Sequence, residues 1–139
     1  MVTPAQACGA TTRPGGPESL EPAWSKSGLA YVTARDLGVD TAVGAKAFGA
    51  WLATRTLWLA PPGKAAVRLA YAGSGVHDPV WSADGTTLMV VRGSRAYLLE
   101  PAARHIVEVA AGLTPDLYPM GYFGQLDYGQ VLAWYSGRA

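Results

Sequence analysis

The chain has few of the residues that build metal sites and disulfides. It contains one cysteine, Cys8, and two histidines, His77 and His105, among 139 residues. A single thiol cannot form an intrachain disulfide, so the redox compartment is left open. Two histidines and one cysteine also do not make the closely spaced ligand sets that indicate zinc. The sequence therefore predicts no metal site.

Charge is scarce as well. Charged residues make up 15% of the chain, and eleven basic against ten acidic residues leave a net charge of +1. No long run of either sign provides an electrostatic footprint for nucleic acid. No apolar run approaches the roughly 18 residues of a membrane span, and residues 1–16 lack the apolar stretch of a secretory signal. We expect neither a nucleic acid partner nor a membrane span, and the sequence does not fix the localisation.

The common catalytic motifs are missing too. No serine has glycine two residues before and two residues after it, so there is no nucleophile elbow, and residues 72–76 resemble one only superficially. Neither a Walker loop nor a dinucleotide fingerprint is present, so no cofactor is expected. His77 and Asp78 are the best titratable neighbours, but aspartates such as Asp78 and Asp84 more often accept hydrogen bonds from nearby backbone in turns. The sequence favours a protein that is not an enzyme.

What the chain does have is an internal repeat. Residues 21–25 read Glu-Pro-Ala-Trp-Ser and residues 78–82 read Asp-Pro-Val-Trp-Ser, and each segment continues into a turn and an apolar strand. Two further apolar strands follow in each unit, at 56–60 with 66–70 and at 95–100 with 105–110. The glycine of the Asp84-Gly85 turn supplies the positive φ that a tight hairpin needs. Each unit therefore predicts four short antiparallel strands.

The second unit, with Trp81, Asp84 and Gly85, resembles the TolB-like β-propeller repeat. The first unit, with Trp24, resembles it less closely because its turn, Ser27-Gly28, lacks the aspartate. The resemblance covers roughly residues 21–112 and implies an all-β fold of two four-stranded antiparallel propeller blades. It implies core positions for both tryptophans. It also implies extracytoplasmic use, which no export signal in this chain supports.

The repeat divides the chain into a leader, two blades and a tail. We expect a flexible leader at 1–20, blades at 21–72 and 78–112, and a capping tail with a short helix at 113–139. An insertion at 37–54 in the first blade places Phe48, Trp51 and Leu52 on one face of a short expected helix. Two blades cannot close a ring of about 4 to 8. The remaining blades lie in a longer reading frame or in other copies or chains, or else the leader and tail cap a compact two-blade fold.

One rim of the blades is a candidate binding face. In an antiparallel meander, the loop between the second and third strands leaves at the same end as the crossing to the next blade. This end gathers the insertion, the crossing at 71–78 and the turn at 92–95. Its aromatic, cationic and histidine/aspartate side chains suit a protein interface, although Trp and Phe on a helix more often belong to a core. The candidate binding residues are Phe48, Trp51, Arg55, Tyr71, His77, Asp78, Arg92 and Arg95.

The sequence thus favours a non-catalytic propeller scaffold, part of a larger TolB-like propeller, that binds a protein or ligand. Its partners would be another protein or the remaining blades. A second interpretation is the gating propeller of a serine peptidase of the prolyl-oligopeptidase type, whose catalytic domain is not in this chain. A third is a homo-oligomeric structural module, in which exposed blade edges of several copies complete one another.

Overall fold

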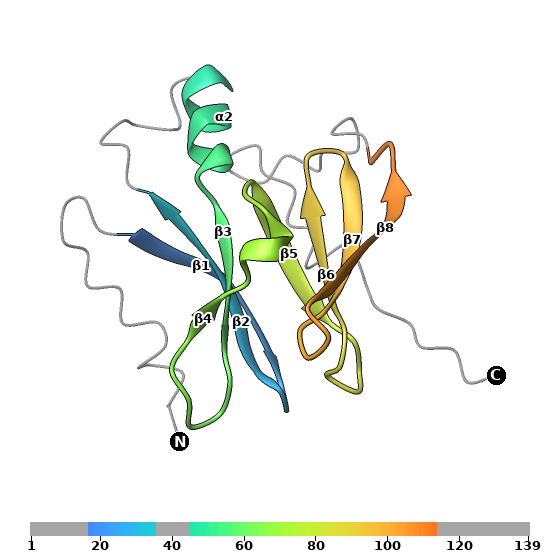
Figure 1. The fold of residues 1–139 in the computed structure, drawn as a ribbon. Coiled ribbons are helices and arrows are strands. Elements are labelled where there is room, and N and C mark those ends of the chain that lie inside the picture. Colours follow the sequence, from blue (N-terminus) through green and yellow to red (C-terminus); the bar gives the residue numbers. More distant parts are fainter. Residues whose placement is uncertain (1–16, 36–44, 114–139) are drawn as a thin grey trace.

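The computed structural model describes residues 17–35 and 45–113, which form two four-stranded antiparallel sheets (Figure 1). The first sheet contains β1 (Pro17–Ser25), β2 (Gly28–Arg35), β3 (Thr56–Ala60) and β4 (Val67–Arg68) in this order. The second contains β5 (Val76–Trp81), β6 (Leu88–Arg92), β7 (Arg95–Glu100) and β8 (His105–Ala111). The prediction of an all-β fold with two four-stranded meanders is confirmed.

Helix is limited to two short segments in the described part of the chain. The insertion contains α2 (Ala45–Ala53), as predicted, and the crossing between the sheets contains the 3-10 turn η2 (Ala70–Ala72). Neither helix is long and apolar enough to cross a membrane. The expected boundary of the leader is wrong at its end, because residues 17–20 pair with residues 32–35 and extend β1. Residues 1–16 and the expected tail helix beyond residue 113 lie outside the described residues.

The strands pair in the same register within each of the two sheets. In the first, Trp24 lies opposite Leu29, and in the second Trp81 lies opposite Leu88. Directly opposed residues point to the same face of a sheet, so the register assigns each residue an equivalent in the other sheet. Equivalent pairs are Trp24 and Trp81, Leu29 and Leu88, Ala30 and Met89, Tyr31 and Val90, Trp58 and Tyr97, and Leu59 and Leu98. The sequence repeat is therefore a structural repeat.

A bulge interrupts the first strand of each sheet just before its tryptophan. The register shifts between Leu20 and Ala23 in β1, and at the equivalent place in β5. Glu21 and Asp78, the acids of the repeat, have φ values of 51° and 52°, a left-handed conformation that is uncommon outside glycine. A proline, which has no N–H for the ladder, follows each acid, and bulges are one of the places where a sheet accepts proline.

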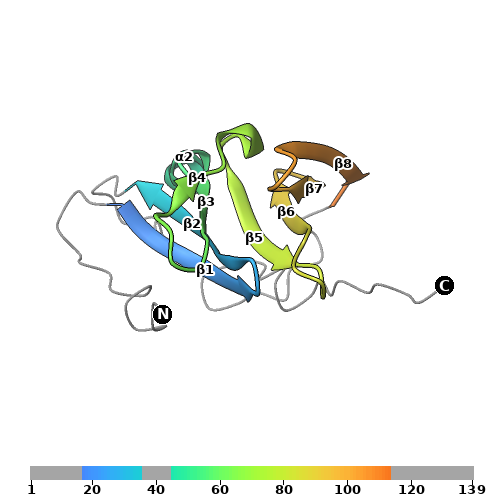
Figure 2. The same ribbon diagram turned by 60° about the horizontal axis from the view of Figure 1, so that its bottom comes forward.

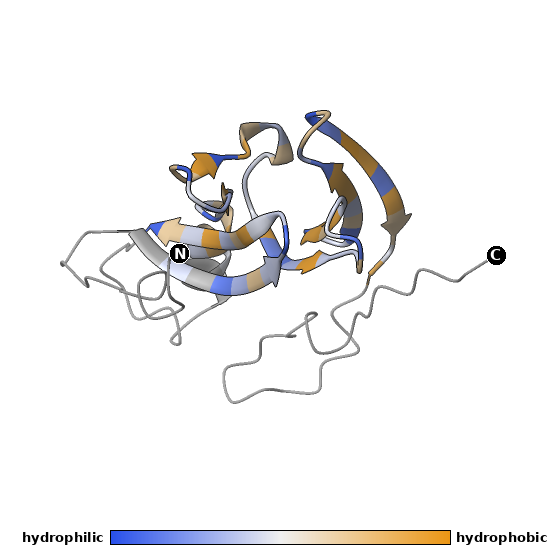
Figure 3. Ribbon diagram, turned by 90° about the horizontal axis from the view of Figure 1, so that it is seen from below, coloured by the Kyte–Doolittle hydropathy of each residue, from blue (hydrophilic) through white to orange (hydrophobic). Residues whose placement is uncertain are grey.

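The two sheets stack face to face. The face that the second sheet turns toward the first is not the equivalent of the face that the first turns toward the second, and we call this arrangement a head-to-tail stack. Strand β5 lies against β1, β2 and β3 (Figure 2), and hydrophobic and hydrophilic residues alternate along the strands (Figure 3). The first sheet contributes Ala30, Val32, Leu57 and Leu59 to the core, and the second contributes Trp81, Leu88, Val90 and Leu99. These two sets are not equivalent, because the equivalents of Trp81 and Leu88 point to the other side of the first sheet. The two sheets therefore face the same way along the stack.

This stacking gives the two tryptophans of the repeat different surroundings. Trp81 is 9% exposed, and its Nε1 donates a hydrogen bond to the backbone carbonyl of Ala23 at 3.0 Å. Trp24 is 51% exposed. The expectation that both are core residues is correct for Trp81 and wrong for Trp24, because no described sheet covers the face of the first sheet on which Trp24 lies.

Candidate functional site

The structure brings together the three segments of the predicted rim. The N–H of Gly75, in the crossing between the sheets, donates to the carbonyl of Arg55 at the start of β3 (2.8 Å). On the other side of the crossing, Arg92 Nη1 donates to the carbonyl of Ala72 (2.8 Å). The insertion, the crossing and the end of β6 therefore meet at one end of the stack, as the meander geometry predicts.

Three of the expected binding side chains are nevertheless buried at this end. Arg55 is 2% exposed, and its guanidinium lies 5.3 Å from the centre of the Trp51 ring, which is buried too. Asp78 is 5% exposed. The prediction that these residues form an open binding surface is wrong, because they pack and bond at the junction of the sheets instead.

The other rim residues with described side chains have contacts of their own. The Arg92 guanidinium lies 4.4 Å from the centre of the Tyr97 ring, and Tyr71 is partly buried against the core. Arg95 is exposed and pairs with Glu108 at 2.7 Å. The side chain of Phe48 is outside the described part of the structure.

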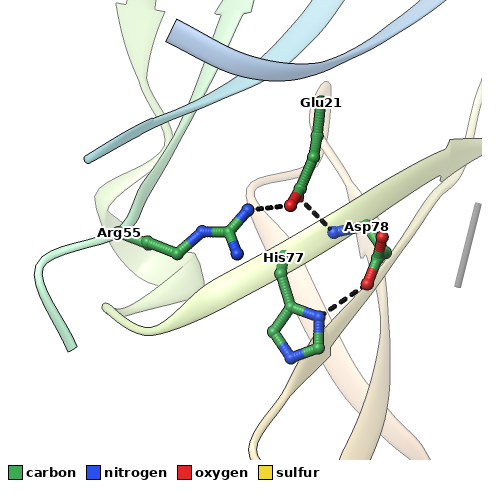
Figure 4. A network of polar contacts seen from close by, with 4 residues as sticks. All are labelled: Glu21, Arg55, His77 and Asp78. Carbon is green, nitrogen blue, oxygen red and sulfur yellow. Dashed lines mark hydrogen bonds and ion pairs between the residues drawn. The ribbon is translucent and has the colours of Figure 1, made fainter. Parts of the chain in front are cut away.

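The polar residues at the junction form a network that links the two sheets (Figure 4). One carboxylate oxygen of Glu21, on β1, accepts a hydrogen bond from the Arg55 guanidinium and forms an ion pair with it. Its second oxygen accepts from the backbone N–H of Asp78 on β5 at 2.7 Å. The Asp78 carboxylate in turn contacts Nδ1 of His77 at 2.7 Å. Glu21 therefore balances the charge of Arg55 and also bonds the neighbouring sheet.

The repeat explains how this network arises. Both bulges hold their acid in the same left-handed conformation, and the N–H of Asp78 bonds the side chain of Glu21 in the other sheet. A buried guanidinium without a countercharge would be costly, so this arrangement stabilises the junction. Sequence reasoning missed Glu21 as a site residue, although its match to Asp78 in the repeat was a signal. Asp78 binds the His77 imidazole rather than acting as the expected turn acceptor.

The second repeat turn is built as the sequence indicates. Asp84 Oδ1 accepts hydrogen bonds from Ser82 Oγ at 2.6 Å, from Thr86 N at 3.0 Å and from Thr86 Oγ1 at 2.8 Å. Gly85 has a φ of 67°, and its carbonyl accepts from Ser27 Oγ of the first sheet at 2.6 Å. The predicted structural role of Asp84 and Gly85 is confirmed, and the turn also contacts the neighbouring sheet.

These hydrogen bonds predict a pH dependence of stability. Donors from Ser82 and Thr86 lower the pKa of Asp84 from 3.8 to about 2. A carboxyl whose pKa is lower in the folded state stabilises the fold above its unfolded pKa, and this contribution is lost as the pH falls toward the folded pKa. We expect Asp84→Asn to lower the free energy of unfolding at neutral pH, with the difference from wild type vanishing between pH 3.8 and about 2. Denaturant unfolding at a series of pH values measures this, and a difference that persists at the acidic end would contradict it.

Neither metal binding nor a match to a known family explains the polar network in the described part of the chain. Within residues 17–35 and 45–113, no group of three or more His, Cys, Asp or Glu side chains could hold a metal ion. No protein-family model matches the chain, and no curated protein matches it. The likeness to TolB-like repeats therefore depends on the repeat motif quoted above. The described polar network bonds one sheet to the other.

Proposed function

We propose that this chain is a non-catalytic scaffold that binds protein through one open face of its first sheet. In this proposal the two sheets are blades of a TolB-like β-propeller. Four-stranded antiparallel sheets arranged around an axis are the units of propellers, and the head-to-tail stack with β5 against β1 is compatible with neighbouring blades. The polar network then has a structural role, because its groups bond the two sheets.

The observation that carries the proposal is an aromatic surface on the first sheet. It consists of Trp24, Tyr31 and Trp58, which we call the open aromatic face. Trp24 is half-exposed, and the rings of Tyr31 and Trp58 are stacked with centroids 6.5 Å apart and 15° between their planes. Trp58 Nε1 donates to Thr33 Oγ1 at 3.0 Å, which orients the indole. Trp and Tyr are enriched at the energetic centres of protein interfaces, and orienting them in advance lowers the entropy cost of binding.

Adjacent positions on β4 provide a controlled test of this face. Arg68 lies opposite Trp58 and Val67 lies opposite Leu59, so the two exposed side chains point to opposite sides of the sheet. A photoreactive amino acid is placed at either position in cells that make the protein. We expect cross-links to a defined protein from position 68 and not from position 67.

The cross-linked protein is then purified and titrated with the chain. Tyr31→Glu, which places a charge in the open aromatic face, is expected to weaken that binding. Identical cross-links from both positions, no cross-links at all, or unchanged binding by Tyr31→Glu would each contradict the proposal.

A further inference from the structure

We propose that the partner of the open aromatic face is a second copy of this chain, docked through the outer face of its β5–β8 sheet. The inference builds on the proposed function and names the partner. It follows from the internal stack, in which Trp81 is covered and its equivalent, Trp24, is half-exposed. The chain contains both surfaces that such a contact needs.

The internal stack shows what the open aromatic face fits. Of its equivalents on the second sheet, Trp81 and Val90 belong to the core that the two sheets share, and Tyr97 packs against this core. The exposed fraction is 51% at Trp24 and 9% at Trp81. The indole N–H of Trp81 also bonds the Ala23 carbonyl. The core residues that meet this face inside the molecule are Ala23, Ala30, Val32, Leu57 and Leu59 of the first sheet, together with Leu69 and Ala72 at the crossing.

The second sheet carries an equivalent of this covering surface. Val80, Met89 and Leu98 occupy the places of Ala23, Ala30 and Leu59, and they lie on the side of the second sheet that faces away from the first. All three are apolar and partly exposed, whereas Val91 and Ala96, at the places of Val32 and Leu57, are 0% and 4% exposed. The surface offered for docking is therefore limited to Val80, Met89 and Leu98. If two chains pack as the two sheets of one chain do, this surface of one chain would lie on the open aromatic face of a second chain. The Val80 carbonyl would then accept from Trp24 Nε1, as the Ala23 carbonyl accepts from Trp81.

A contact of this kind is heterologous, because it joins two different surfaces. Heterologous contacts form closed rings when the rotation between copies closes, and open assemblies when it does not. Propellers hold about 4 to 8 blades, so closed rings of this chain would contain two, three or four copies. A ring built this way leaves no open aromatic face. An isologous dimer would instead pair the same surface twice.

Light scattering on the full chain and two charge variants tests the contact. We expect the wild type to reach multiples of 14.5 kDa as its concentration rises. Trp24→Glu disables one surface and Leu98→Glu disables the other, so each variant alone is expected to remain at 14.5 kDa. An equimolar mixture of the two retains one intact contact and is expected to form a species of two chains. An isologous contact predicts no such recovery.

Val107→Glu is the matched control on the same outer face. Val107 lies opposite Leu98, but its equivalent Val67 is still 49% exposed in the internal stack, so the contact does not reach it. This variant is expected to assemble like the wild type. If Leu98→Glu loses its near-UV circular dichroism and does not fold, Met89→Glu takes its place in the mixture.

Two results would overturn the inference. A wild type that stays at 14.5 kDa at every concentration shows that copies do not dock, and a mixture that stays at that mass shows that the contact joins other surfaces. Cross-links from position 68 to a different protein would, in either case, leave the proposed binding function standing. Failure of the self-docking inference is thereby separated from failure of the proposed function.

Discussion

Glu21→Gln is expected to lower the free energy of unfolding by about 1–3 kcal/mol, because it removes the countercharge of a buried arginine while the Glu21 side chain itself is 26% exposed. Arg55 is 2% exposed and forms an ion pair with Glu21, so the variant leaves a buried guanidinium without this countercharge. The glutamine amide still has one oxygen that can accept the hydrogen bond from the Asp78 N–H, so the variant removes the negative charge but not this hydrogen bond. Urea denaturation at neutral pH, followed by far-UV circular dichroism, measures the loss.

The chain contains a matched control for this variant. Arg95 and Glu108 form a second arginine–glutamate pair at 2.7 Å, but their side chains are 54% and 37% exposed. Exposed pairs contribute about 0–1 kcal/mol, so Glu108→Gln is expected to have little effect. Adding Arg55→Met to Glu21→Gln is expected to recover part of the loss, because an apolar side chain then replaces the uncompensated charge. Equal losses at Glu21 and Glu108 would contradict the role assigned to the network.

The strands were largely predictable because two independent signals coincided. Apolar runs bounded by turn residues gave Thr56–Ala60 and Arg95–Glu100 the bounds that the structure shows. The repeat then fixed which strands correspond. The expected strand at 66–70 shrinks to Val67–Arg68 because the chain turns into η2 at Ala70. Only two residues of this edge strand pair with β3.

The contacts between the sheets were harder to predict. Arg and Glu are usually solvent-exposed, so nothing in the local sequence of Arg55 marks it as buried. Its burial follows from the stacking of two sheets whose relative position the sequence does not encode locally. The same holds for Trp24 and Trp81, which have the same motif neighbours. Their burial differs because only one of them has a described sheet packed on it.

This difference leads to a second large expected effect, at the two repeat tryptophans. Trp81→Ala is expected to lower the free energy of unfolding by about 3–5 kcal/mol, since it leaves a cavity between the sheets. It also removes the donor bonded to the Ala23 carbonyl. Trp24→Ala is expected to cost about 1 kcal/mol or less, because half of that side chain is already in water. Both values are measured by urea denaturation at concentrations where light scattering finds single chains.

Raising the protein concentration separates the stability of the single folded chain from the stability that docking between copies adds. If copies dock on the open aromatic face, assembly stabilises the folded state by mass action, and the wild-type unfolding midpoint rises with concentration. The midpoint of Trp24→Ala is then expected to rise far less, although its value for single chains is close to that of the wild type. Trp81→Ala starts from a low midpoint because its defect lies within one chain. Equal losses from the two substitutions in single chains would contradict the head-to-tail stack, since the two indoles would then be equally covered.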